Sequence, residues 1–289
     1  SVLMQCFSLT CLMSVLWYIV GYSLAFGEGN AWVGDLNNLF MVNVTKDSMA
    51  GTIPEALFAV FQMTFAVITP ALIVGAFAER MKFSAMLLFS SIWLLVVYAP
   101  VCHWVWGGGW LSELGTLDFA GGIVVHITAG VAALVSAIVI GNRKGWPQSA
   151  MPPHNMTMTV TGAGMLWVGW FGFNVMSAQT LDGISGLVAV NSLMAMVGGI
   201  IAALWFGKND PGFIHNGPLA GLVAVCAGSD VMHPIGSLLV GIIAGWIFVK
   251  LFTLVQKSKK VDDVLGVWPL HGVCGAWGGI AAGIFGSEA

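Results

Sequence analysis

Residues 118–130 read DFAGGIVVHITAG, and residues 263–275 read DVLGVWPLHGVCG. Both stretches fit the pattern D-x-x-G-x-x-x-x-H-x-x-x-G, in which four fixed residues stand at the same offsets. Four matches at fixed offsets rarely arise by chance, even in a chain that contains 38 glycines. The two stretches therefore indicate an internal repeat, and each copy opens a long apolar segment.

The composition of the chain points to a lipid environment. Of its 289 residues, 58% are hydrophobic and 8% carry a charged side chain, whereas a soluble protein has about 25% charged residues. So few charges cannot cover a water-facing surface, and part of the surface is therefore expected to contact lipid. The formal net charge of −3 gives no indication of nucleic-acid binding.

The apolar residues form segments long enough to cross a bilayer as helices, which takes about 20 residues each. Nine such segments lie near residues 1–26, 55–78, 83–103, 118–140, 155–177, 185–206, 213–229, 231–254 and 264–286. A transmembrane β-barrel would instead show alternating runs of about ten residues. We therefore expect an all-α integral membrane protein with a polytopic helical bundle.

The basic residues predict how these segments are oriented. Of the ten Lys and Arg residues, all but Lys46 fall in the links after the even-numbered segments or at the end of the eighth segment. These are Arg80, Lys82, Arg143, Lys144, Lys208, Lys250, Lys257, Lys259 and Lys260. Because cytoplasmic loops are enriched in Lys and Arg, the first segment is expected to run outward across the cell membrane.

The two copies of the pattern are expected to cross the membrane in opposite directions. They open the fourth and the ninth segment, so an odd number of crossings separates them. This predicts inverted-topology repeats of five helices, at about 1–140 and 155–286, within one transmembrane domain over 1–289. In such a fold a shared site lies at the midplane between the halves.

Each histidine of the pattern lies eight residues after its aspartate. At a rise of 1.5 Å per residue, that distance is about 12 Å into an apolar core about 30 Å thick. His126 and His271 are therefore expected to reach the middle of the membrane from opposite faces. Ionisable residues at that depth usually belong to a pathway.

The neighbours of the histidines have simpler explanations. Asp118 and Asp263 stand at opposite interfaces, where a carboxylate caps a helix N-terminus. Gly122 and Gly130 are expected to leave room beside His126 for a narrow lumen. Two imidazoles without a carboxylate are a poor ligand set, so we expect no metal site. The five cysteines show no CxxC pairing and are expected to be small buried hydrophobic residues.

Six stretches, two of which overlap the repeated pattern, identify a resemblance. GYSLAFGEG (21–29), FQMTFAVITPALIVGAFAER (61–80), HWVWGGGW (103–110), LDFAGGIVVHITAG (117–130), GWFGFN (169–174) and HGVCG (271–275) together resemble the Amt branch of the Amt/Mep/Rh ammonium transporter family. The resemblance covers nearly the whole chain. It implies eleven helices around a pore in each subunit of a homotrimer, of which the nine segments resemble the second to the tenth. The first and last helices of the family are expected to be absent.

The resemblance also assigns roles to single positions of this chain. These are Phe61, Trp106 and Ser177 in an outer ammonium-binding site, Phe65 and Phe173 in a pore gate, His126 and His271 as pore histidines, Asp118 as a structural aspartate, and Gln62 and Trp170 as pore-adjacent residues. Pro269 departs from the family pattern. Since proline lacks an N–H group, it is expected to kink the ninth segment and to disturb the position of His271.

The resemblance implies ammonium transport across the membrane. Ammonium would bind at the outer site by cation–π attraction, worth about 0.5–2 kcal/mol, and would lose a proton near the gate. Ammonia would then pass the two histidines through a hydrophobic pore, and methylammonium would be an analogue.

No cofactor is expected. The implied partners are two further copies of the chain, membrane lipid and a PII-class signalling protein.

Two other functions stay open at this point. Relatives within the family bind ammonium and signal through a fused C-terminal domain, so the chain is alternatively an ammonium-sensing receptor domain. A neutral-gas channel of the Rh type is a further alternative, against which the aromatic cation site argues. An enzyme is not expected, because the sequence has no nucleophile–base set, phosphate-binding loop or metal constellation.

Overall fold

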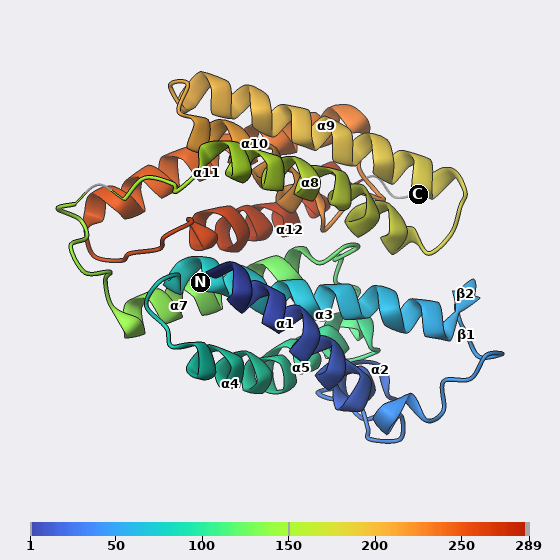
Figure 1. The fold of residues 1–289 in the computed structure, drawn as a ribbon. Coiled ribbons are helices and arrows are strands. Elements are labelled where there is room, and N and C mark those ends of the chain that lie inside the picture. The colour runs from blue at the N-terminus through green and yellow to red at the C-terminus, as the bar shows by residue number, and fades with distance from the viewer. Residues whose placement is uncertain (1, 150, 287–289) are drawn as a thin grey trace. The chain divides into compact units, whose positions relative to one another are not determined.

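The computed structural model describes residues 2–149 and 151–286, which are mainly helical (Figure 1). Ser1 and the last three residues of the expected domain 1–289 lie outside the described residues. The chain divides between Thr116 and Leu117 into two compact units. The first three predicted segments fall in the first unit, and the other six fall in the second.

The first unit contains three long helical runs. They are α1 (Val2–Leu16) with the π-helical turn η1 (Trp17–Gly21) and α2 (Tyr22–Phe26), then α3 (Glu55–Phe77), and then α4 (Phe83–Trp93) with the π-helical turn η3 (Leu94–Tyr98) and α5 (Ala99–Trp106). The third run extends three residues beyond its predicted end at 103. Shorter elements are η2 (Leu39–Met41), α6 (Trp110–Glu113) and an antiparallel pair of strands, β1 (Met49–Ala50) and β2 (Ile53–Pro54).

The second unit contains the other six helical runs. They are η4 (Gly122–Ile127) with α7 (Thr128–Ile140), α8 (Met156–Val175) with η5 (Met176–Ala178), α9 (Gly183–Phe206), α10 (Pro211–Val225), α11 (Pro234–Ser258), and η6 (Trp268–Val273) with α12 (Cys274–Phe285). Each of the nine predicted segments is therefore helical. Among the described residues, six of the helical runs are long and apolar enough to span a membrane.

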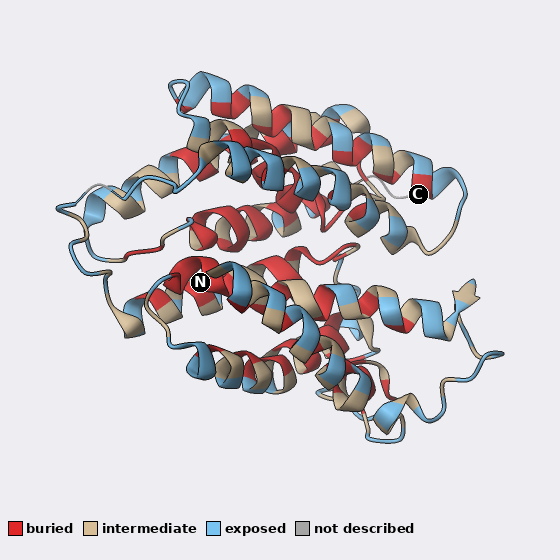
Figure 2. Cartoon of the chain, viewed as in Figure 1, coloured by how far each residue is buried: buried red, intermediate tan, exposed pale blue. Residues whose placement is uncertain are grey.

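Small residues hold the core of the second unit together. The helices α9, α10 and α11 pack against one another, and glycines let their backbones approach closely. A Cβ on Gly245 of α11 would lie 2.8 Å from both the Ala202 Cβ and the Gly199 carbonyl oxygen of α9. Apolar side chains such as Val168 and Trp205 are exposed, at 74% and 81%. Most of η6 and the start of α12 are buried (Figure 2). This distribution is expected where lipid surrounds the protein.

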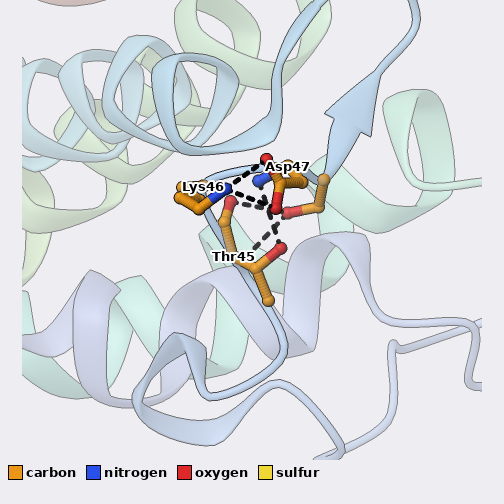
Figure 3. Close-up of polar contacts among 4 residues, drawn as sticks. Thr45, Lys46 and Asp47 are labelled. Atoms are coloured by element: carbon orange, nitrogen blue, oxygen red, sulfur yellow. Dashed lines mark hydrogen bonds and ion pairs between the residues drawn. The ribbon is translucent and has the colours of Figure 1, made fainter.

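The loop before β1 carries Lys46, the one basic residue expected on the outer side. Its Nζ lies 2.7 Å from the Asp47 Oδ1, and the Asp47 backbone N–H donates to the Thr45 Oγ1 at 3.3 Å (Figure 3). The Lys46 and Asp47 side chains are 86% and 78% exposed. So exposed a pair contributes little stability, but it neutralises the positive charge of this loop.

Candidate functional site

The first copy of the repeated pattern folds into a capped π-helical turn. The Asp118 Oδ2 accepts hydrogen bonds from the backbone N–H groups of Ile123 and Val124, both at 3.0 Å. Gly121 has a φ of 102°, a left-handed conformation that favours glycine. The chain thus turns sharply into η4, and the carboxylate satisfies two N–H groups that have no partner within the helix.

The second copy folds in the same way. The Asp263 carboxylate accepts hydrogen bonds from the N–H groups of Val267 at 3.0 Å and Trp268 at 2.8 Å. Gly266 has a φ of 69°. The aspartate and the glycine of each copy therefore have the same structural roles, which confirms the expected capping by Asp118 and Asp263.

Each histidine lies within a π-helical turn. His126 is in η4 and His271 is in η6, two turns of six residues each. Such turns replace the regular helical hydrogen bonds locally and are frequent at functional sites. The sequence predicted the helices but not these turns, because the spacing of apolar residues does not distinguish the two helix types over so short a length.

The two copies cross in antiparallel orientation. A Cβ on Gly275 would lie 2.9 Å from the Gly122 carbonyl oxygen and 3.1 Å from the His126 Cβ, and a Cβ on Gly130 would collide with the backbone of Gly272. Residues 122 and 126 of the first copy lie against residue 275 of the second copy, whereas residue 130 lies against residue 272. The two helices therefore run in opposite directions. The antiparallel crossing is therefore confirmed. Gly130 leaves room for the other helix backbone and not for a lumen, because the crossing fills that space.

This crossing brings the two histidine rings together. Their Nδ1 atoms lie 3.1 Å apart, and the rings are nearly parallel, with an interplanar angle of 22° and centroids 5.2 Å apart. His126 is 1% exposed and His271 is 6% exposed. The imidazoles are therefore a buried, hydrogen-bonded pair whose residues are 145 positions apart in the chain.

Pro269 does not disturb this pair, so the expected kink is wrong. Pro269 stands in the first turn of η6, where helix N–H groups have no partner within the helix. The missing N–H group of Pro269 therefore removes no hydrogen bond from the helix. The capping carboxylate of Asp263 bonds to the two residues just before it, Val267 and Trp268.

Aromatic side chains of α8 lie against His126. The Trp170 ring is stacked on the imidazole at an angle of 16°, and the Phe173 ring at 21°, with both centroid distances 5.6 Å. One turn further, the Ser177 hydroxyl donates to the Phe173 carbonyl oxygen at 2.9 Å. That bond uses the only hydrogen of the Ser177 hydroxyl. The lone pairs of the Ser177 oxygen are therefore oriented to accept other hydrogen bonds.

The remaining predicted residues lie together in the first unit. The rings of Phe61 and Phe65 are perpendicular with centroids 4.9 Å apart, and Phe65 also contacts Trp106 at 5.5 Å. Phe65 is buried, while Phe61 and Trp106 are half-buried. Gln62 is buried, and its Oε1 has no hydrogen-bond partner among the described residues. The structure thus joins these aromatic residues into one cluster.

Two residues beside the histidines were not predicted as part of the site. The Cys226 Sγ lies 3.5 Å from the His126 Nε2 and 3.3 Å from the Asn174 Oδ1. Cys226 follows α10 directly, within an apolar run that suggested only a buried hydrophobic residue. Asn174 belongs to the GWFGFN stretch, so the motif contained a signal that was not used. Among the described residues, no group of three or more His, Cys, Asp or Glu side chains could hold a metal ion.

The fold and this site define a polytopic helical membrane protein with a buried histidine pair where the two copies of the repeated pattern cross. The sequence model of the Ammonium Transporter Family matches residues 1–289. The chain is 47% identical to an ammonium transporter of Bacillus subtilis, over 99% of this chain and 72% of that protein. The chain belongs to the ammonium transporter family, and it is a multi-pass membrane protein.

Solved structures show the same fold. The structure of Saccharomyces cerevisiae Mep2 has a TM-score of 0.92 and 31% identity, covering 100% of this chain and 66% of that one. A structure described as a sensor Amt protein has a TM-score of 0.91 and 30% identity, covering 99% of this chain and 74% of that one. The chain thus spans between about two thirds and three quarters of the length of these relatives.

Proposed function

We propose that the protein transports ammonium across the membrane by recruiting NH4+, removing its proton and conducting NH3 past the histidine pair. The observation that carries this proposal is the buried contact between His126 and His271 at the crossing of two inverted repeats. Membership of the ammonium transporter family supports the choice of substrate. No chemical conversion other than proton transfer is assigned to the protein.

The outer recruitment site would be made by Phe61, Trp106 and Ser177. Half-buried aromatic rings attract a cation to their faces, which contributes about 0.5–2 kcal/mol. Ser177 supports this role because its hydroxyl hydrogen is used by Phe173, which leaves its oxygen as an acceptor for an N–H of ammonium. Methylammonium would bind in the same way.

The gate would be formed by Phe65 and Phe173, with Gln62 and Trp170 beside the pore. Both phenyl rings lie within aromatic clusters of their own units. A constriction of this kind offers no carbonyls or carboxylates to replace a hydration shell, so an intact ion should not pass. Ammonium can give up a proton and potassium cannot, which is the physical basis proposed for selectivity.

Below the gate, the two histidines would line an apolar lumen. Buried imidazoles favour the uncharged form, and a neutral pair at 3.1 Å shares one hydrogen between its rings. Such a pair offers a polar contact to ammonia without placing a fixed charge in the pathway. Asp118 would have a structural role, since its carboxylate caps the turn that carries His126.

The test is a current measurement on the complete protein in liposomes. An ammonium pulse should produce a current that is absent with potassium, and methylammonium should give a smaller one. A His126→Ala variant should abolish this current or make it unselective. If the wild-type protein passes potassium as readily as ammonium, or if the variant keeps a selective current, the proposal is wrong.

A second candidate is an ammonium-sensing receptor domain, which the likeness to the sensor Amt structure favours. The same outer site would bind ammonium, and a fused C-terminal domain would transmit the signal. Saturable ammonium binding by the complete protein without any current would support this function. Sustained current under the same conditions would exclude a purely sensory role.

The proposed function implies an assembly and partners. We propose one transmembrane domain over 1–289, composed of repeats at about 1–140 and 155–286, in a homotrimer surrounded by lipid of the cell membrane. A PII-class signalling protein would bind the basic cytoplasmic face, on which Lys144 and Lys257 are exposed. The mass of the purified complex in detergent tests the trimer, since a monomeric mass at micromolar concentration would contradict it.

A further inference from the structure

A series of polar contacts runs through the buried part of the second unit and ends at the histidine pair. The Asn174 Nδ2 donates to the Ser192 Oγ at 2.9 Å. The Asn174 Oδ1 lies 3.3 Å from the Cys226 Sγ, which in turn lies 3.5 Å from the His126 Nε2. Ser192, Asn174 and Cys226 are all 0% exposed. Because buried polar groups must find partners within the protein, each contact limits where the next hydrogen can lie.

The shortest contacts of the Cys226 sulfur are to oxygen acceptors, and its contact with the His126 Nε2 is longer, at 3.5 Å. Two oxygen acceptors are within reach of the sulfur, the Leu222 carbonyl at 3.1 Å and the Asn174 Oδ1 at 3.3 Å. The backbone N–H of Cys226 donates to the Val223 carbonyl and not to the Leu222 carbonyl. The thiol of Cys226 therefore faces the Leu222 carbonyl where the backbone N–H would otherwise lie. Whichever oxygen takes the hydrogen, the sulfur presents a lone pair to His126.

This direction determines the hydrogens of both imidazoles. A sulfur that offers a lone pair to His126 is matched by a His126 Nε2 that carries a hydrogen. A neutral imidazole has only one N–H, which leaves the His126 Nδ1 as an acceptor. The His271 Nδ1, at 3.1 Å from that atom, is then the donor, and the His271 Nε2 is left with its lone pair.

We propose that Cys226 is a positioning residue that holds His126 in its Nε2–H tautomer and, through it, His271 in its Nδ1–H tautomer. The consequence for transport rests on the proposed function. Ammonia in the lumen would meet a hydrogen-bond-accepting nitrogen at His271 and not at His126. The pair is thereby polarised along the pathway, although the two copies of the repeat fold alike.

The test is to observe the tautomers directly. The complete protein is labelled with 15N-histidine and reconstituted in liposomes, where solid-state NMR separates protonated from unprotonated ring nitrogens. Signals are assigned by their loss in His126→Gln and His271→Gln variants. The expected wild-type result is a protonated Nε2 on His126 and a protonated Nδ1 on His271. The opposite pair of tautomers in the wild-type protein would overturn the proposal, without any variant at Cys226.

Three variants separate positioning from packing. In Cys226→Ala the ratio of Nε2–H to Nδ1–H tautomer of His126 should fall about threefold to tenfold, the effect of one lost hydrogen bond. Cys226→Ser should restore the ratio, because a hydroxyl keeps a donor and an acceptor. Cys274→Ala is the matched control, since Cys274 is equally buried but has its thiol on the Ala244 carbonyl at 3.5 Å. A shift in the control as large as in Cys226→Ala would overturn the proposal.

The same liposomes distinguish this inference from the proposed function. The expected tautomers without any ammonium current would contradict transport and leave the role of Cys226 intact. A selective current with unchanged tautomers in Cys226→Ala would contradict the role of Cys226 and leave transport intact. If Cys226→Ala does not fold, the wild-type spectrum and Cys226→Ser still decide, because a wild-type tautomer pattern in Cys226→Ser is expected and its loss there would count against the proposal.

Discussion

Arg143 and Asp262 form a two-point ion pair between two loops, one that follows the helix of the first pattern copy and one that precedes the second copy. The Arg143 Nε lies 2.9 Å from the Asp262 Oδ2 and the Nη2 lies 3.0 Å from the Oδ1, while the Arg143 backbone N–H also donates to the Oδ2 at 2.8 Å. The pair connects the loop after α7 to the loop before η6. Asp263, the next residue, caps the turn that carries His271, so the ion pair lies directly beside that cap.

Removal of this ion pair should destabilise the protein. In Asp262→Ala, Arg143 loses its carboxylate partner, and breaking a buried pair costs about 3–5 kcal/mol. The Asp262 side chain is 0% exposed and that of Arg143 is 13% exposed, so water compensates little. Thermal unfolding of the purified protein in detergent measures the loss. Asp47→Ala, which breaks the exposed pair with Lys46, is the control and should cost no more than about 1 kcal/mol. Equal effects of the two substitutions would contradict the prediction.

The helix crossing should not tolerate larger residues. In Gly130→Val the new side chain would collide with the Gly272 backbone, which cannot move without displacing His271. We expect loss of folded protein or a destabilisation of about 1–3 kcal/mol, as in other overpacked cores. Gly162→Ala in α8 is the control, because a Cβ there meets nothing within 4 Å and alanine favours the helix. The yield of monodisperse protein and its unfolding temperature provide the measurement, and a stable Gly130→Val protein would argue against a rigid crossing.

The two capping aspartates should have similar effects on the histidine pair. Asp118→Ala and Asp263→Ala each leave two backbone N–H groups without a partner, at a cost of about 0.5–2 kcal/mol. Both should lower the ammonium current by displacing a histidine. Asp210→Ala removes a comparable cap from α10, where the carboxylate accepts from Gly212 at 2.7 Å. That variant should lose stability and keep the current, and a loss of current there would show that the effect is not specific to the histidine turns.

The aromatic cluster of the first unit should determine the affinity for ammonium. In Trp106→Leu the loss of about 0.5–2 kcal/mol of cation–π attraction should raise the half-saturating ammonium concentration by about twofold to thirtyfold. The maximal current should change less, because the histidine pair is untouched. Trp205→Leu, at a side chain that is 81% exposed on α9, should leave the affinity unchanged. An unaltered affinity in Trp106→Leu would remove Trp106 from the proposed outer site.

Most of the fold could be predicted from the sequence. Each of the nine apolar segments is a helix, since a chain that crosses lipid must satisfy its backbone hydrogen bonds within each segment. The capping by Asp118 and Asp263 was also predictable, because a cap depends on residues only a few positions away. The π-helical turns and the harmless position of Pro269 were not, since both depend on where the helix begins to within one residue.

The sequence by itself determined which residues form helices, which two stretches repeat, and that two histidines occupy equivalent places in them, because these are properties of local spacing. The tertiary structure alone decided that Gly130 lies against Gly272 and that Cys226 lies against His126. Those contacts join residues a hundred or more positions apart, and they depend on how helices pack. Nothing in the apolar run around Cys226 distinguishes a thiol beside an imidazole from one among hydrocarbon side chains, so only the folded chain shows this contact.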